Sequence, residues 1–105
     1  MSAKPNPSTD DFAAQRKKLR AQIDGLDDEL LRLFNERATL ALEVGRLKKK
    51  AGEKLFDAER EDSIYKRMVK NNTGPLGSEA TRRLFERIID EIRRVERVEV
   101  YEKHD

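Results

Sequence analysis

Two basic residues, Arg37 and Lys48, fall within an apolar pattern and are the first candidates for chemistry. Apolar residues recur at steps of mostly four and three, a spacing typical of one seam of a long amphipathic helix. The seam comprises Leu19, Ile23, Leu26, Leu30, Leu33, Leu40, Val44, Leu47 and Ala51. Position 37 belongs to this seam, and Lys48 lies about 20° from it around a helix with ~3.6 residues per turn. A cation among apolar side chains is costly unless it meets an anion, so the pair predicts a buried anionic partner.

Both residues also have a purely structural interpretation. Arg37 fits a seam arginine that pairs with a carboxylate such as Glu36 or with one across an interface. Lys48 precedes Lys49 and Lys50, and the three fit a solvated helix end, where cations favour the helix dipole. The sequence leaves these alternatives open.

The other candidates are Arg20, the run at residues 57–61, and Glu96. Arg20 fits an ordinary solvated helix arginine, and the 57–61 run fits a first helical turn with weak side-chain pairs. Glu96 continues an apolar stripe but lies among arginines, as a surface ion pair would. Arg20 precedes Arg37 by about 25 Å along a helix, too far to line the same small pocket from the same chain. In an antiparallel dimer of long helices it would instead reach the partner's pocket.

Three helices are expected to position these residues. The first is capped by Asp10 or Asp11 and runs to about Ala51, roughly 60 Å at ~1.5 Å per residue, where Gly52 ends it. No single chain of this size covers such a seam, which favours a second copy packed antiparallel.

The second helix opens at Phe56 and Asp57, with Asp57 as N-cap, and ends at the Asn/Gly/Pro run 71–75. Its apolar stripe is Ile64, Tyr65, Met68 and Val69. The third helix starts with Ser78 as N-cap and extends to about Glu102. Its stripe is Leu84, Phe85, Ile88, Ile89, Ile92 and Val95. The predicted class is all-α, with one long and two shorter helices.

Composition supports an oligomer and excludes several classes of function. Of 105 residues, 36% are hydrophobic and 42% charged, a balance that suits helices completing their core against another chain. The net charge of +2 gives no support to nucleic-acid binding. The absence of cysteine excludes disulfides and thiolate metal sites, and the only histidine is His104, so metal catalysis and histidine acid–base chemistry are not expected. No apolar run suits a membrane span or a secretory signal, so a cytoplasmic location is expected. Residues 1–10 are interpreted as a flexible leader and 11–105 as one domain.

Five blocks of this sequence resemble the all-α AroQ class of chorismate mutase. They are LRAQIDGLDDELL at 19–31, NER at 35–37, EVGRLK at 43–48, DAERE at 57–61 and LFERIIDE at 84–91. The resemblance implies an intertwined homodimer of three-helix chains that converts chorismate to prephenate, in phenylalanine and tyrosine biosynthesis, without a cofactor. It also implies two active sites, each shared between the chains.

The resemblance assigns a role to each candidate. Arg37 and Arg20 of the partner chain would grip the two substrate carboxylates, and Lys48 would hydrogen-bond the ether oxygen and a carboxylate. Arg60 would add to the anion cradle. Asp57 and Glu61 would hold the ring hydroxyl.

Two positions of the third helix depart from the commoner family pattern. Ile92 stands where many relatives have serine, which removes one side-chain hydrogen bond to the substrate. Glu96 stands where many have a glutamine that donates to the ether oxygen, and a carboxylate donates only when protonated.

Two alternative functions remain at this stage. An isochorismate-pyruvate lyase would have a similar fold and cationic pocket, and assays on the two substrates would discriminate. A non-catalytic helical dimerisation or regulatory module, such as one cut from a larger enzyme of the shikimate pathway, would show no turnover and no binding of prephenate or a transition-state analogue.

Overall fold

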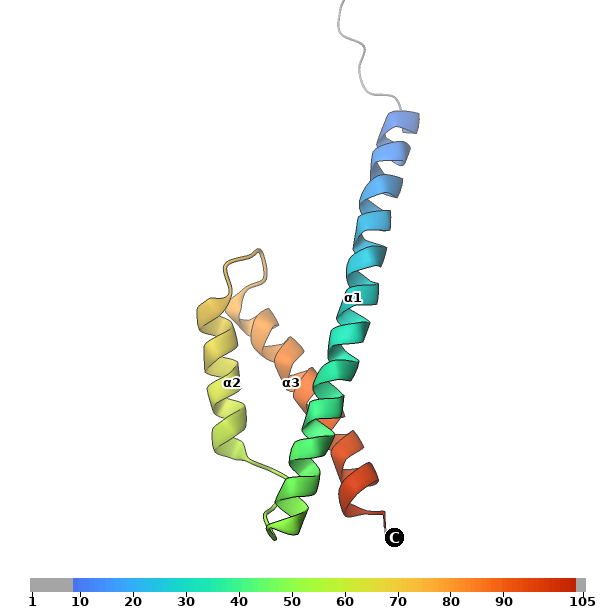
Figure 1. Ribbon diagram of the computed structural model, residues 1–105. Helices are drawn as coiled ribbons and strands as arrows, with labels where there is room; N and C mark the ends of the chain where they lie inside the picture. Colours follow the sequence, from blue (N-terminus) through green and yellow to red (C-terminus); the bar gives the residue numbers. More distant parts are fainter. Residues whose placement is uncertain (1–8, 104–105) are drawn as a thin grey trace, which may run out of the picture. The chain divides into compact units, whose positions relative to one another are not determined.

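The computed structural model describes residues 9–103, which form three α-helices and a terminal π-helical turn (Figure 1). In chain order these are α1 (Thr9–Lys50), α2 (Ala58–Asn71), α3 (Ser78–Glu96) and η1 (Arg97–Tyr101). No strand occurs within residues 9–103. The predicted all-α class, with one long and two shorter helices, is confirmed. Within the same residues no helix is both long and apolar enough to cross a bilayer.

The start of α1 differs from the prediction by one or two residues. The helix begins at Thr9, so Asp10 and Asp11 lie within its first turn and are not its N-cap. Carboxylates in a first turn interact favourably with the helix dipole, which explains why both are accommodated there. Of the predicted leader, residues 1–8 lie outside the described residues, and Thr9 and Asp10 are helical.

Gly52 ends α1 as predicted, through a specific backbone turn. Its φ of 71° lies in the left-handed region that favours glycine. The Gly52 N–H donates to the Lys49 carbonyl at 3.1 Å, and the Glu53 N–H donates to the Lys48 carbonyl at 2.8 Å. This pair of hydrogen bonds is the Schellman arrangement, which satisfies carbonyls at the end of the helix and turns the chain toward α2.

The caps of α2 and α3 were predicted with different success. Asp57 caps α2, and its carboxylate accepts a hydrogen bond from the Arg60 N–H at 3.0 Å, as predicted. Ser78 was predicted as the cap of α3, but Gly77 holds that position. Gly77 is extended, and its carbonyl accepts from the Thr81 N–H and hydroxyl, each at 3.0 Å, so Ser78 is already helical.

The C-terminal end of α3 also departs from the prediction of one helix to about Glu102. α3 ends at Glu96, and the next five residues wind as η1. Val100 is buried, its carbonyl accepts from Lys49 Nζ at 2.8 Å, and the Tyr101 hydroxyl donates to the Glu53 carbonyl at 3.1 Å. These contacts attach η1 to the residues at the C-terminal end of α1. They occur where the backbone changes from α-helical to the wider π-helical winding.

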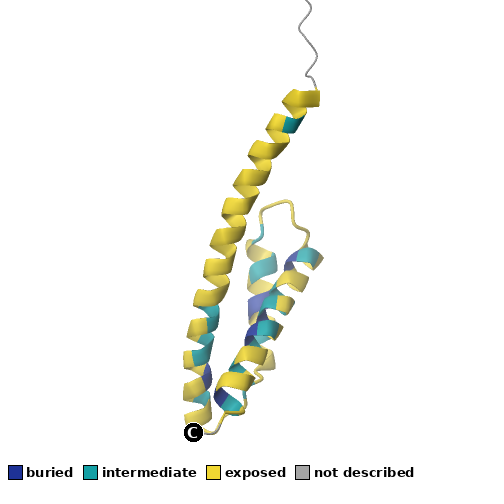
Figure 2. Ribbon diagram, turned by 90° about the vertical axis from the view of Figure 1, so that its right-hand side faces the viewer, coloured by how far each residue is buried: buried dark blue, intermediate teal, exposed yellow. Residues whose placement is uncertain are grey.

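The core lies between α2 and α3. Ile64, Tyr65 and Ile89 are buried together, and Met68 and Phe85 pack against them. Figure 2 shows the buried positions along the facing sides of these two helices. The predicted stripe of α3 is only partly covered, since Leu84 and Val95 remain exposed.

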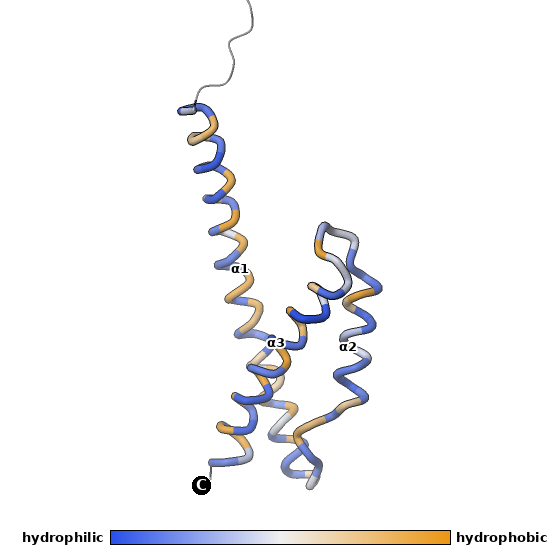
Figure 3. Tube along the Cα trace, turned by 180° about the vertical axis from the view of Figure 1, so that it is seen from behind, coloured by the Kyte–Doolittle hydropathy of each residue, from blue (hydrophilic) through white to orange (hydrophobic). Residues whose placement is uncertain are grey.

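The chain divides into two compact units, residues 1–33 and 34–105. The described part of the first unit is the N-terminal portion of α1. Its seam side chains are 44–59% exposed, and so are Leu40, Val44 and Leu47 of the second unit, at 50–65%. Apolar positions recur along α1 in Figure 3. Within each unit, taken by itself, these seam side chains are largely uncovered.

Candidate active site

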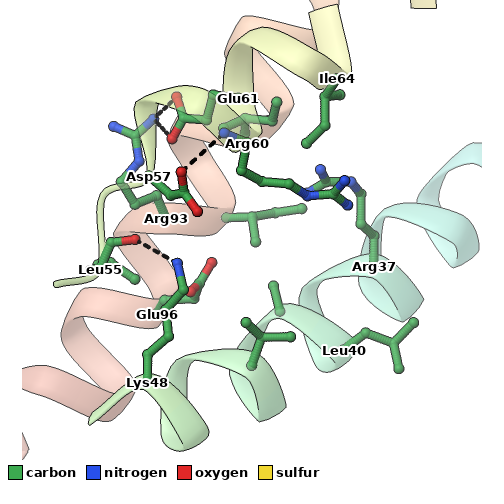
Figure 4. Close-up of a pocket in the computed structure, with 14 residues that line it drawn as sticks. Arg37, Leu40, Lys48, Leu55, Asp57, Arg60, Glu61, Ile64, Arg93 and Glu96 are labelled. Carbon is green, nitrogen blue, oxygen red and sulfur yellow. Dashed lines mark hydrogen bonds and ion pairs between the residues drawn. The ribbon is translucent and has the colours of Figure 1, made fainter. Parts of the chain in front are cut away.

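A pocket of about 290 Å³ lies within the second unit and is walled by α1, the loop before α2, α2 and α3 (Figure 4). Its lining residues are Arg37, Leu40, Ala41, Val44, Lys48, Leu55, Asp57, Arg60, Glu61, Ile64, Ile89, Ile92, Arg93 and Glu96. Seven of the eight predicted site residues are among them, and Arg20 is not. Apolar walls with a few converging charged groups are typical of small-molecule sites.

Arg37 and Arg60 come from different helices, yet their guanidinium groups point toward one another in Figure 4. Burial lowers the pKa of Arg37, the nearby Arg60 lowers it further, and the Glu96 carboxylate opposes these effects. An arginine nevertheless stays charged at neutral pH. None of the ion pairs within residues 9–103 involves Arg37, so the site holds repelling cations that an anion would stabilise.

Lys48 lies on the same helix as Arg37, on the same wall of the pocket. Its Nζ donates a hydrogen bond to the Leu55 carbonyl at 3.2 Å. The turn at the end of α1 brings Leu55 to this position. The ammonium group is half-buried and keeps further donors for a ligand.

Asp57 and Glu61 stand one turn apart at the start of α2. Asp57 is tied to its own helix by the capping hydrogen bond. Glu61 is tied to α3, because Arg93 Nη2 lies 2.5 Å from Oε1 and 2.6 Å from Oε2 of the Glu61 carboxylate. Both acids line the pocket and present acceptor oxygens to it.

Glu96 lies across the pocket from these acids and beside Lys48 (Figure 4). Burial raises the pKa of its carboxyl, and the charges of Lys48, Arg37 and Arg93 only partly offset this effect. The sequence left open whether burial or the nearby cations have the larger effect on the pKa of Glu96, and in the structure burial has the larger effect. A carboxyl of this kind holds its proton to a higher pH than an exposed glutamate does.

Gly45 supplies the space that Glu96 occupies. It is a buried residue of α1, and an added Cβ would lie 3.2 Å from Glu96 Oε2 and 3.7 Å from a Val100 methyl group. The first distance is tighter than ordinary packing allows. The sequence analysis did not identify this role for Gly45.

Ile92 is buried and lines the pocket with hydrocarbon only. It therefore adds shape to the wall and no hydrogen bond. Arg20 belongs to the first unit, where it borders a shallow hollow with Arg16, Lys17 and Asp24.

Arg93 was missed as a site residue by the sequence analysis, which treated it only as one of several cations around Glu96. The sequence signal that could have identified Arg93 is the one that identified Arg37, namely a cation at an inward-facing position of an amphipathic helix. Arg93 follows Ile89 by four residues and precedes Glu96 by three, so it lies on the inward face of α3. Its partner Glu61 is 32 residues away in the chain, and only the packing of α2 on α3 brings the two together.

The chemistry that this pocket can perform is anion binding, orientation and hydrogen-bond donation. Its cations suit carboxylates, its acids suit a hydroxyl, and Glu96 is a donor while it is protonated. Within residues 9–103 no group of three or more histidine or acidic side chains is placed to hold a metal ion.

Residues 19–97 match the family model described as chorismate mutase type II. The chain belongs to this family. Among chorismate mutases of known structure, form II from Thermus thermophilus is 31% identical, with a TM-score of 0.80 over 82% of this chain and 98% of that one. The chorismate mutase of Helicobacter pylori, solved in complex with prephenate, is 26% identical, with a TM-score of 0.74 over 79% and 90% of the two chains.

A bifunctional chorismate mutase/prephenate dehydratase from Stutzerimonas stutzeri is 42% identical over 73% of this chain. The chain spans only 22% of the length of that relative. The sequence blocks that suggested the chorismate mutase family are therefore matched both in sequence and in fold.

Proposed function

We propose that this chain is a chorismate mutase, converting chorismate to prephenate. The observation that carries the proposal is the group of cations Arg37, Arg60 and Lys48 around one apolar-walled pocket, with burial and repulsion destabilising Arg37. Chorismate carries two carboxylates and would supply the missing negative charge. The related Helicobacter pylori enzyme, solved with prephenate, supports this choice of ligand.

The reaction is a [3,3] rearrangement in which a carbon–oxygen bond of the ether breaks while a carbon–carbon bond forms. It needs no nucleophile and no added proton in its balance. Catalysis consists of holding the flexible ether in its reactive shape and stabilising the negative charge that grows on the ether oxygen. The pocket offers groups for both tasks.

In this proposal each lining residue has one task. Arg37 grips a carboxylate by two parallel hydrogen bonds, and Arg60 adds to the same anion cradle. Lys48 directs a point charge at the ether oxygen and a carboxylate. Asp57 and Glu61 accept from the ring hydroxyl.

Glu96 is placed as the second donor to the ether oxygen. Its raised pKa supports this role, because a protonated carboxyl donates whereas a carboxylate presents only acceptors. Ile92 closes the wall, and the hydrogen bond that many relatives obtain from serine is absent there.

We further propose that the active unit is a homodimer in which Arg20 enters the partner's pocket and completes the carboxylate cradle. The exposed seam of α1 supports a partner, since apolar side chains of this extent on one helix favour burial against another chain. The cytoplasmic location, the leader at 1–10 and a chorismate mutase domain at 11–105 stay predictions.

The deciding experiment is to incubate the purified chain separately with chorismate and isochorismate and to identify the products by chromatography. We expect chorismate to be converted to prephenate. Release of pyruvate from isochorismate, with no prephenate from chorismate, would favour a lyase. No turnover of either substrate and no binding of a transition-state analogue would favour a non-catalytic module and overturn the proposal.

A further inference from the structure

The contact between Arg93 and Glu61 is the least exposed ion pair in the described part of the chain. One nitrogen of Arg93, Nη2, lies 2.5 Å and 2.6 Å from the two oxygens of Glu61. The side chains of Arg93 and Glu61 are 25% and 15% exposed. In the other ion pairs, one of which also involves Arg93, every other side chain is at least 41% exposed. An ion pair at this depth fixes geometry in a way that solvated pairs do not.

Arg93 is itself held from two further directions. Asp90, one turn earlier on α3, lies 3.2 Å from the same Nη2, and the guanidinium stacks 4.9 Å from the centre of the Phe56 ring. These contacts restrict where the guanidinium can move. Figure 4 shows Arg93 of α3 reaching Glu61 at the start of α2, with Asp57 beside them.

We propose that Arg93 is a positioning residue that holds Glu61 in place to accept the ring hydroxyl of the substrate. The inference deepens the proposed function and rests on it. The role proposed for Arg93 does not require contact with the substrate, because it is exerted through Nη2, which contacts Glu61 and Asp90, while the guanidinium packs over the Phe56 ring.

The charge of the ligand explains why Glu61 needs such a residue. A carboxylate at the wall of a pocket for a dianion repels the ligand, and this repulsion is strong where water is partly excluded. Pairing with Arg93 compensates the charge of Glu61, and each carboxylate oxygen that accepts from Nη2 keeps a second lone pair with which to accept from the substrate hydroxyl. The Tyr65 hydroxyl, 3.5 Å from Oε1, is too distant to orient the carboxylate equally well.

The test compares two ligands that differ only in the hydroxyl. We would measure the affinity of an oxabicyclic diacid analogue of the transition state, with and without its hydroxyl, for the full chain and its variants. Wild type is expected to prefer the hydroxylated ligand by about tenfold or more, the value of a hydrogen bond to a charged acceptor. Arg93→Gln is expected to reduce this preference to about threefold or less.

Two further variants make the comparison specific. Arg94→Gln removes the same charge from the next residue, which is exposed and outside the pocket, and is expected to retain the full preference. Glu61→Gln is expected to lose the preference, and adding Arg93→Gln to it is expected to change the preference no further. The ratio of two affinities is independent of the folded fraction, so partial unfolding of a variant does not affect it.

The inference is overturned if Arg93→Gln weakens both ligands equally, since Arg93 would then act on affinity or stability without directing Glu61. It is also overturned if wild type binds both ligands with no preference. Failure of the proposed function has a different signature. If the ligands bind with the expected preference but chorismate is not converted, only the proposed reaction fails. If neither ligand binds, the proposed function fails and the inference, which rests on it, fails with it.

Discussion

Replacing Glu96 by glutamine is expected to change the pH dependence of the reaction. In wild type the protonated carboxyl donates to the ether oxygen, and its ionised form opposes the growing negative charge there. The groups that face Glu96 are Lys48 and Arg37 from α1, Arg93 from α3 and Glu61 from α2. Burial outweighs the three cations and raises the pKa of Glu96, so the active form persists above the ordinary glutamate value of about 4.3.

The size of the effect follows from the loss of one donor. Below the raised pKa, kcat/KM for wild type is expected to be flat. Above it, kcat/KM falls about tenfold per pH unit, to a floor ~10²-fold to 10³-fold lower, the usual loss for one preorganised donor. Glu96→Gln keeps a donor of nearly the same shape at every pH. Its profile is therefore expected to remain flat where that of wild type declines.

Stability provides a second measurement that does not depend on turnover. Because the pKa of Glu96 is higher in the folded chain, the folded state binds this proton more tightly than the unfolded state does. The free energy of unfolding is thus expected to fall, relative to Glu96→Gln, as the pH rises from the ordinary to the raised pKa. Below both pKa values that contribution is fully present.

The assay is kcat/KM for chorismate from about pH 5 to 9 at constant ionic strength, with urea unfolding at the same pH values. Glu99→Gln is the matched control, since Glu99 is exposed, lies outside the pocket and is paired with Lys103. It is expected to follow wild type. Identical profiles for wild type and Glu96→Gln in both measurements would refute the placement of Glu96 at the ether oxygen.

Three further predictions address the cation pair, the shared site and the turn after α1. Arg37→Ala and Lys48→Ala are each expected to lower kcat/KM by at least ~10²-fold and to leave the helicity measured by circular dichroism unchanged. Lys50→Ala is the control and is expected to leave kcat/KM unchanged, because Lys50 is exposed and lies outside the pocket. Mixing inactive Arg20→Ala and Lys48→Ala chains is expected to restore activity after subunit exchange, since one site of each heterodimer then holds both residues; proven exchange without activity would contradict a shared site. Gly52→Ala is expected to reduce the free energy of unfolding by about 1 kcal/mol in urea denaturation, because its φ of 71° disfavours a Cβ.

The features that the sequence predicted well are those set by local spacing. The cap at Asp57 and the stop at Gly52 depend on residues within one turn, and both are confirmed. The spacing of Arg37 and Lys48 on one helix likewise places both on one pocket wall. The prediction of Ser78 as cap was wrong, because Gly77 holds that position without a side-chain hydrogen bond, and a glycine there gives no capping signal in the sequence.

The features that escaped prediction depend on contacts between helices. Arg93 contacts Glu61 only because α3 packs on α2, and no local sequence pattern around either residue indicates that the two form an ion pair. The direction of the Glu96 pKa shift requires burial to be weighed against four charges that come from all three α-helices. The winding of η1 is associated with Lys49 and other groups near the end of α1, which sequence spacing does not reveal.

The narrow approach at Gly45 links two positions that lie far apart in the chain. With a Cβ at 45 placed 3.2 Å from Glu96 Oε2, neither site can change freely while the other stays the same. An alanine at 45 requires the Glu96 carboxyl to move by a few tenths of an ångström from the position that it holds beside Lys48. The absence of a single methyl group at 45 thus sets how closely the carboxyl of Glu96 can lie against the backbone of α1.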